Sequence, residues 1–217
     1  MNATEEAVEL LDMRAVMREL AKRRPIFHSE ADFQHALAWE IRAQHTDCQI
    51  RLERPVDGVD PSRRRPRVDV WLWHRESTVL LELKYYTSEL NLTLDHKDPV
   101  WCEEFRLASR DAPDVPRHGL VEDIARVERA VNQGASSRGY ALLLSNHKGL
   151  WTSRDNCKAN DAEFGLTTGV SCATSSDGAT ARGRAWRWRA RTNHAGRTTR
   201  SFRAQALTAS SGTCSSK

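Results

Sequence analysis

Two apolar stretches on either side of a short polar turn dominate the middle of the chain. Residues 67–86 read RVDVWLWHRESTVLLELKYY, and in both halves apolar side chains alternate with other residues. This alternation is typical of β-strands, in which successive side chains point to opposite faces. We therefore expect two adjoining strands, with Asp69 in the first and with Glu82 and Lys84 on one face of the second.

Two carboxylates and a lysine inside apolar strands need partners to be tolerated. Magnesium is a suitable partner, because one or two carboxylates, a carbonyl and several waters satisfy it. We expect Asp69, Glu82 and the main-chain carbonyl of Leu83 to bind Mg²⁺ or Mn²⁺, and Lys84 to orient or help deprotonate an attacking water. The alternative is a solvent-facing Glu-x-Lys pair on an ordinary hairpin, because this spacing also arises by chance.

The segment resembles the PD-(D/E)xK nuclease superfamily, although Val68 stands where the motif has proline. The order of elements agrees from about residue 26 to residue 151. The resemblance implies an α/β protein with a restriction-endonuclease-like core, a mixed central β-sheet flanked by helices in the order αβββαβ. The strings FHSEADFQHALAWEI, ELKY, D-x-x-R-x-E and LSN also resemble a group of uncharacterised bacterial proteins of this superfamily. Besides the two strands above, the expected elements are helices at 29–43 and 120–132 and strands at 49–54 and 139–145.

The same resemblance implies further site residues. The first helix of such nucleases often sends a glutamate toward the metal, which indicates Glu30 here, with Glu40 as the alternative. In the D-x-x-R-x-E helix, Asp123 or Arg126 reaches the site, although a surface ion pair at i, i+3 is the favoured explanation. Substrate contacts are expected at Gln34, Arg67, Tyr86, Arg126 and Asn146.

The expected activity is metal-dependent hydrolysis of phosphodiester bonds, with DNA ahead of RNA as the substrate. The competing interpretation is a catalytically inactive nucleic-acid-binding or scaffold protein of the same fold. A third is an enzyme broken by a damaged C-terminus. The oligomeric state is left open.

Composition limits the remaining classes. The 217 residues suit one domain with an appendage, and no apolar run is long enough to cross a membrane. The N-terminus is acidic, unlike a secretory signal, so we expect a cytoplasmic protein without membrane contact. The five cysteines form no C-x-x-C pair and the histidines show no ligand spacing, which indicates reduced thiols and no zinc site.

Charge divides the chain unevenly. Residues 165–217 hold eight arginines and Lys217 against the single acid Asp177, a net +8, so the rest carries −4 of the total +4. This tail is rich in Ala, Ser, Thr, Gly and Arg, which indicates either a disordered basic extension or a reading-frame shift near Gly165. We expect an N-terminal segment at 1–24 whose residues 5–24 form a flanking helix. A nuclease-like core at 25–151 and an extension at 152–217 follow. Within the core, 87–119 is expected to be an irregular loop that overhangs the cleft.

Overall fold

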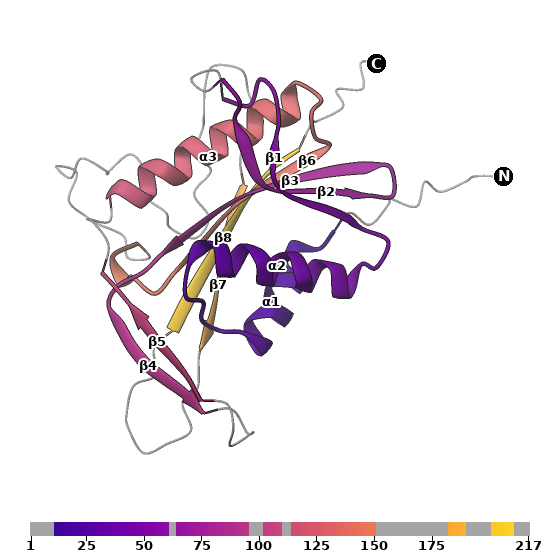
Figure 1. Cartoon of the computed structure of the whole chain (residues 1–217). Helices are drawn as coiled ribbons and strands as arrows, with labels where there is room; N and C mark the ends of the chain where they lie inside the picture. The colour runs from indigo at the N-terminus through magenta and orange to yellow at the C-terminus, as the bar shows by residue number, and fades with distance from the viewer. Residues whose placement is uncertain are drawn as a thin grey trace.

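The protein is an α/β protein with a mixed β-sheet flanked by helices (Figure 1). The computed structural model describes residues 11–60, 64–95, 102–109 and 114–150, together with the backbone of 182–189 and 201–210. Six strands form the main sheet in the order β1-β2-β3-β6-β8-β7, and β3 and β6 run parallel while the other neighbours are antiparallel. The strands are β1 (Gln49–Pro55), β2 (Arg67–His74), β3 (Ser77–Tyr86), β6 (Arg138–Ser145), β7 (Arg182–Arg189) and β8 (Ser201–Ser210).

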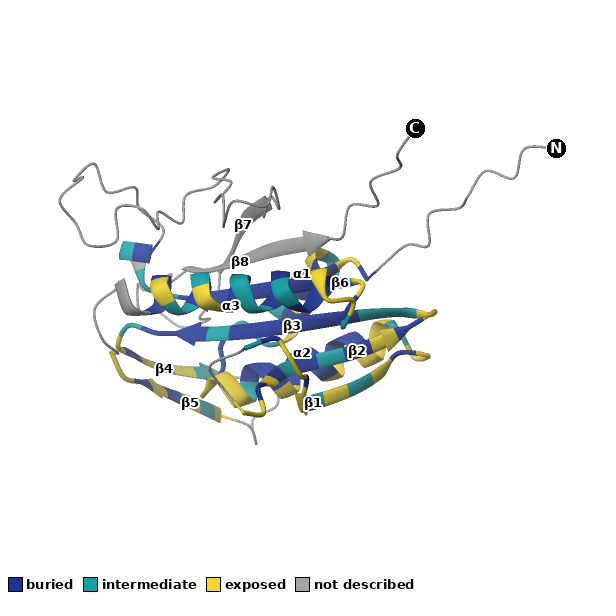
Figure 2. Cartoon of the chain, turned by 90° about the horizontal axis from the view of Figure 1, so that it is seen from above, coloured by how far each residue is buried: buried dark blue, intermediate teal, exposed yellow. Residues whose placement is uncertain are grey.

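Helices cover both faces of the sheet. The helix α2 (Glu30–Gln44), with α1 (Met13–Arg23) packed against it, covers one face, and α3 (Asp114–Asn132) covers the other. Figure 2 shows α2 and α3 on opposite sides of β3. The expected order of helix, three strands, helix and strand is present, with a hairpin inserted before α3.

Alternation along β3 explains why both faces are covered. Its odd-numbered residues from Val79 to Tyr85 belong to a large core cluster with α1 and α2, whereas Leu80 and Tyr86 pack in two smaller clusters with α3. Glu82 and Lys84, which alternate with the odd-numbered residues between Leu80 and Tyr86, therefore lie on the α3 side. The neighbouring strand β6 is buried over the whole of 139–145, as its apolar run predicts.

The apolar stripes predicted for the two main helices are buried in the structure. In α2 the stripe of Phe33, Leu37 and Ile41 is fully buried, and Ser29 caps the helix by accepting a hydrogen bond from the backbone N–H of Asp32 at 3.1 Å. The predicted stripe of α3 is also buried, at Leu120, Ile124, Val127 and Val131.

The first helix begins later than the range 5–24 predicts. Its N-cap is Asp12, whose carboxylate accepts hydrogen bonds from the N–H groups of Arg14 and Ala15 at 2.9 and 3.1 Å. A capping aspartate leaves the helical conformation itself, so the regular helix starts at Met13. Residues 1–10 lie outside the described residues.

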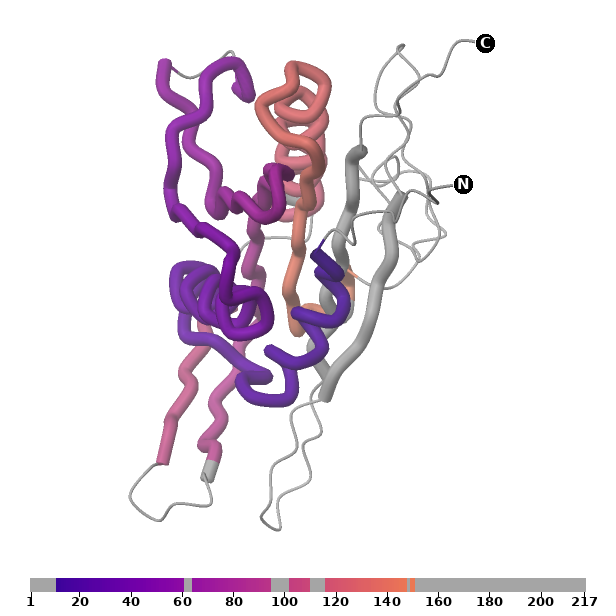
Figure 3. The backbone as a smooth tube through the Cα atoms, turned by 90° about the vertical axis from the view of Figure 1, so that its right-hand side faces the viewer, coloured from indigo at the N-terminus to yellow at the C-terminus, as the bar shows by residue number. Residues whose placement is uncertain are grey.

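The prediction of an irregular loop over 87–119 is wrong for most of its length. Residues Leu90–Asp95 and Cys102–Leu107 form β4 and β5, a two-stranded hairpin that projects from the body (Figure 3). Leucines alternate along β4, a short period-two signal that the polar surroundings obscured. The helix α3 already starts at Asp114, because Pro116 falls in its first turn, where a missing N–H costs no helical hydrogen bond.

Two strands occur within the C-terminal extension. The backbone of β8 pairs antiparallel with β6, and β7 pairs with β8 at the sheet edge. Both stretches therefore differ from the disordered extension that composition indicates. The other residues of 151–217 lie outside the described residues, and the reading-frame shift near Gly165 stays a prediction.

Candidate active site

The candidate site lies where the pairing of β2 and β3 ends. The ladder between these strands stops just before Asp69, and two N–H groups of β3 are then taken up by carboxylates. Leu83 N donates to Asp69 Oδ2 at 2.6 Å, and Tyr85 N donates to Glu30 Oε2 at 2.7 Å. Buried backbone groups need partners, so these two acids replace the missing strand. Acids from β2 and α2 are thereby fixed at one edge of β3.

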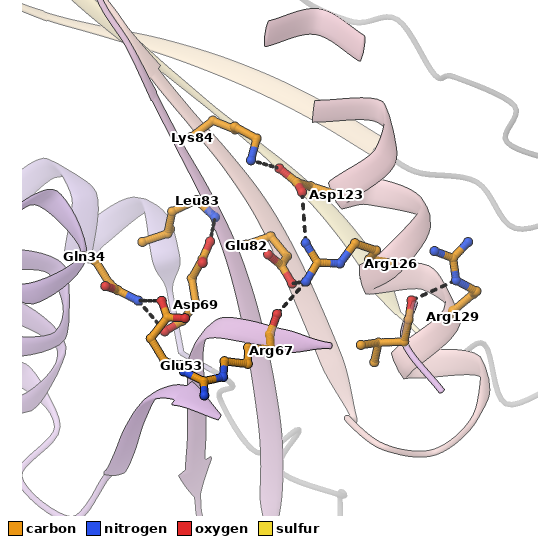
Figure 4. A network of polar contacts seen from close by, with 11 residues as sticks. Gln34, Glu53, Arg67, Asp69, Glu82, Leu83, Lys84, Asp123, Arg126 and Arg129 are labelled. Carbon is orange, nitrogen blue, oxygen red and sulfur yellow. Dashed lines mark hydrogen bonds and ion pairs between the residues drawn. The ribbon is translucent and has the colours of Figure 1, made fainter. Parts of the chain in front are cut away.

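Glu82 and Lys84 face α3 at the same point of the sheet. Lys84 Nζ lies 3.1 Å from Asp123 Oδ2, and Arg126 Nη2 lies 3.0 Å from Glu82 Oε1 (Figure 4). Asp123 and Arg126 do form the predicted i, i+3 contact, at 3.4 Å. Both side chains are largely buried and point at β3, however, so the favoured prediction of a surface ion pair is wrong.

Gln34 connects this region to the edge strand β1. Its buried Nε2 donates to the carbonyl oxygen of Asp69 at 2.7 Å and to Glu53 Oε1 at 3.0 Å. Glu53 has a φ of 51°, and both Glu53 and Asp69, which lies opposite it, are left out of the register of β1 with β2. Pairing continues in the same register on both sides, so the ladder is interrupted here without an inserted residue. Gln34, a residue predicted to contact substrate, therefore uses its side-chain amide nitrogen to hold the backbone of Asp69 in place.

The other residues predicted to contact substrate differ in their exposure and in their partners. Arg67 has an exposed side chain, and its carbonyl accepts a hydrogen bond from Arg126. Tyr86 is buried on the α3 side. Asn146 bonds through both ends of its amide to the backbone of Ser88, at 2.7 and 3.2 Å, which ties the end of β6 to the segment after β3.

Glu30 rather than Glu40 is the helix acid near the site. Glu40 is buried and its carboxylate contacts Arg23 at 3.4 Å and accepts from Gln44 at 2.7 Å. The first contact joins α1 to α2 and the second lies within α2, both on the part of α2 away from its N-terminus. The alternative assignment to Glu40 is therefore not supported by position.

The cluster holds more acid than base. It contains four carboxylates, those of Glu30, Asp69, Glu82 and Asp123, against the two cations Lys84 and Arg126. With all six groups ionised the net charge is about −2, a strong repulsion in a medium of low dielectric constant.

The pKa values express this excess. Burial raises the pKa of Asp69 to about 6, although the hydrogen bond from Leu83 opposes the rise. Burial and the charge of Asp69 raise the pKa of Glu82 to about 9, despite the nearby guanidinium of Arg126. Repulsion from the neighbouring acids therefore favours a neutral Glu82 carboxyl, whereas the contact with Arg126 at 3.0 Å favours the carboxylate.

Asp123 and Lys84 stabilise each other's charge. Burial raises the pKa of Asp123, and attraction to Lys84 counteracts this. Burial by itself lowers the pKa of Lys84, but attraction to Asp123, Glu30 and Asp69 outweighs it and raises the pKa. Lys84 is therefore an ammonium ion at neutral pH.

The donor set fits a hard divalent cation. A charge of +2 would neutralise the cluster, and its two buried carboxylates, those of Glu82 and Asp123, supply oxygen donors that now contact Arg126 at 3.0 Å and Lys84 at 3.1 Å. The carbonyl of Leu83 points to the same strand edge as its N–H, toward Asp69. Among the described residues no three side chains of His, Cys, Asp or Glu are grouped as a metal cage, but magnesium requires only one or two carboxylates.

Compared with family models, with curated proteins and with solved structures, the chain matches none. In the described part of the chain, no helix is long and apolar enough to cross a bilayer. The site thus has to be interpreted from its own chemistry. Sequence reasoning undervalued Asp123, and the available signal was the helical spacing of D-x-x-R-x-E opposite a strand with two polar residues.

Proposed function

We propose that the protein is a metal-dependent nuclease with a restriction-endonuclease-like core, and that DNA is its substrate. The observation that carries this proposal is a cluster of four acids and two bases at the point where β2 and β3 separate. Glu82 and Asp123 are buried, Asp69, Lys84 and Arg126 are partly buried, and Glu30 lies at the exposed border of the cluster. The cluster has the acid-rich charge and the oxygen donors that a divalent cation requires.

Asp69, Glu82 and the carbonyl of Leu83 would hold the cation, Mg²⁺ or Mn²⁺. Asp69 Oδ2 accepts the hydrogen bond from Leu83 N, and the other carboxylate oxygen would bind the cation. Gln34 fixes the main chain that carries it, through the 2.7 Å hydrogen bond to the Asp69 carbonyl. When bound, the cation supplies a more acidic water and neutralises charge on the phosphate. Glu30 completes the edge by holding the N–H of Tyr85 and orienting a water or ligand.

Lys84 acts as a cation rather than as a base. Its raised pKa keeps the ammonium protonated, so it can donate hydrogen bonds to the attacking water and to a phosphate oxygen. Asp123 holds Lys84 at 3.1 Å and sets its direction. Arg126 balances Glu82 and stays anchored to Asp123 and to the carbonyl of Arg67.

Cleavage assays test this proposal. Purified protein is incubated with plasmid DNA, single-stranded DNA and RNA in Mg²⁺, Mn²⁺ or EDTA, beside the variants Lys84→Ala and Lys22→Ala. Lys22 is an exposed lysine paired with Glu19 on α1 and serves as the matched control. We expect metal-dependent cleavage that Lys84→Ala lowers by about 10²–10³-fold and Lys22→Ala leaves unchanged. Cleavage that survives Lys84→Ala would remove Lys84 from the mechanism.

A second candidate is an inactive binding or scaffold protein of the same fold. It is favoured by one observation: Glu82 and Lys84 already have protein partners, Arg126 and Asp123, at 3.0 and 3.1 Å. Such pairs can neutralise a former metal site. Calorimetric titration with Mg²⁺ and Mn²⁺ separates the two, since absence of both metal uptake and cleavage would leave the binding protein.

A further inference from the structure

Two tryptophans of β2 share one face of the sheet. Trp71 and Trp73 are two residues apart, so both point to the α3 side, while Leu72 between them is buried in the core with α1 and α2. Trp71 is partly covered by the smaller cluster next to α3, whereas Trp73 is 46% exposed. The helix α3 packs against β3, β6 and β8, so Trp73 lies beside rather than beneath it.

Two arginines of the neighbouring strand β1 lie next to Trp71. Arg51 of β1 is the register partner of Trp71, and the guanidinium of Arg54 lies 4.2 Å from the centre of the Trp71 ring. Both arginines are exposed, and among the described residues no acid lies within ion-pair distance of either. Further exposed arginines precede or begin β2, at positions Arg64, Arg65 and Arg67.

The chemistry of this surface suits a single strand of nucleic acid. Exposed aromatic rings stack on unpaired bases, and neighbouring arginines contact the phosphates. A duplex keeps its bases stacked on each other and offers only its edges and backbone. The cluster of arginines is also unusual for a body whose residues before 165 carry a net charge of −4.

The same strand leads to the candidate active site. Asp69 lies four residues before Trp73 on β2, about 13 Å away at a rise of 3.3 Å per residue. We propose that the Trp–Arg face, formed by Arg51, Arg54, Trp71 and Trp73, binds single-stranded nucleic acid and presents it to the cluster around Asp69. This inference rests on the proposed function, because it names the form of that function's substrate.

A second exposed tryptophan provides the comparison. Trp39 of α2 is 82% exposed and borders a groove of about 570 Å³ between α1 and α2. Two of the three arginines of that groove, Arg23 and Arg24, contact carboxylates, whereas Arg51 of the Trp–Arg face, like the third groove arginine Arg42, contacts only a main-chain carbonyl. Trp39 follows Glu30 by nine residues, or two and a half helical turns, so the two side chains point to opposite sides of α2. Because Glu30 faces the candidate site, Trp39 faces away from it.

Binding without cleavage is the direct test. The full chain is titrated in EDTA into a fluorescently labelled oligothymidylate, and into a duplex of equal length, and anisotropy gives Kd. We expect the single strand to bind more tightly than the duplex, and Trp73→Ala to raise its Kd by at least about fivefold, the lower end for loss of one stacked base. Trp73→Phe should retain most of the affinity, and Trp39→Ala should match the wild type.

Salt dependence tests the arginines separately. The variant with both Arg51→Ala and Arg54→Ala should flatten the slope of log Kd against log salt by about 1.4, because each single-strand phosphate contact contributes about 0.7. Far-ultraviolet circular dichroism and thermal melting show whether each variant is folded.

Several results would overturn the inference. They are an unchanged Kd for folded Trp73→Ala, an equal loss of affinity in Trp39→Ala, tighter binding of the duplex, and no binding of any oligonucleotide, which would leave a protein partner as the occupant.

Failure of the proposed function would give different results. Single-strand binding that depends on Trp73, without cleavage of any polymer in Mg²⁺, would contradict the nuclease activity and support the Trp–Arg face as a binding surface. Single-strand cleavage that Trp73→Ala does not affect would support the nuclease activity and contradict the Trp–Arg face.

Discussion

Replacing Asp69 by asparagine should stabilise the metal-free protein while removing its response to magnesium. Asparagine is nearly the same size as aspartate, and its side-chain oxygen can still accept the hydrogen bond from Leu83 N, which measures 2.6 Å. The substitution removes one negative charge from a cluster that holds an excess of acid. Charge, rather than packing or hydrogen bonding, is therefore the main property that changes.

The magnitude follows from the pKa of Asp69. Burial raises this pKa from the ordinary 3.8 to about 6, so the folded state holds the proton more tightly than the unfolded state does. Stability contributed by such a group is present below pH 4 and is lost as the pH rises through 6. The rise corresponds to about 3 kcal/mol of destabilisation above pH 6, at 1.36 kcal/mol for each pH unit. Asparagine avoids this loss.

Unfolding measurements check the prediction. In EDTA at pH 8, Asp69→Asn should raise the melting temperature by about 6–12 °C, at 2–4 °C per kcal/mol for a protein of this size. The gain should shrink toward zero at pH 4. Magnesium should stabilise the wild type according to its affinity and leave the variant unchanged.

Asp57→Asn is the matched control, because Asp57 is an exposed aspartate after β1. It should melt like the wild type in EDTA and respond equally to magnesium. A variant Asp69→Asn that melts below the wild type at pH 8, or a gain that is as large at pH 4 as at pH 8, would refute the argument from charge.

Three further predictions concern Glu82, Asp123 and Gly139. In EDTA the wild type should lose stability between pH 5 and pH 9 as Glu82 ionises, because its pKa is raised to about 9, and Glu82→Gln should flatten that pH profile in urea unfolding. Asp123→Asn should lower cleavage by at least about 10-fold by releasing Lys84, with substrate affinity less affected; equal kcat in the variant and the wild type would contradict this role. Gly139→Ala should cost about 1–3 kcal/mol in urea unfolding, because an added Cβ would lie 2.2 Å from a methyl carbon of Val127; unchanged stability would show that α3 can move away from β6 at this point.

At the candidate site, the features that would bind a cation lower the stability of the metal-free protein. A metal-free cluster of like charges destabilises the fold, and the backbone at Glu53, with a φ of 51°, adds strain of about 1–2 kcal/mol in the same region. Carboxylates that cap N–H groups of β3 partly offset this, since each satisfies a buried donor. Such a balance is expected where a site is built to receive a cation, and metal binding would stabilise the fold.

The amino-acid sequence alone determined the elements that depend on local periodicity. Alternation in 67–86 placed Glu82 and Lys84 on one face of a strand, and the 3.6-residue spacing identified the buried stripes of α2 and α3. These features follow from backbone geometry within a single element, so no knowledge of neighbours is needed.

Tertiary structure decided which side chains meet. That Asp123 and Arg126 are buried against β3, that β2 separates from β3 at Asp69, and that Gln34 spans to Glu53 all depend on how helices pack on the sheet. A helix surface pair and a buried pair have the same spacing in the chain, and only the distance to β3 distinguishes them. Charge, burial and pKa at the site are therefore properties of the packed protein, because they arise between segments that lie far apart in the chain.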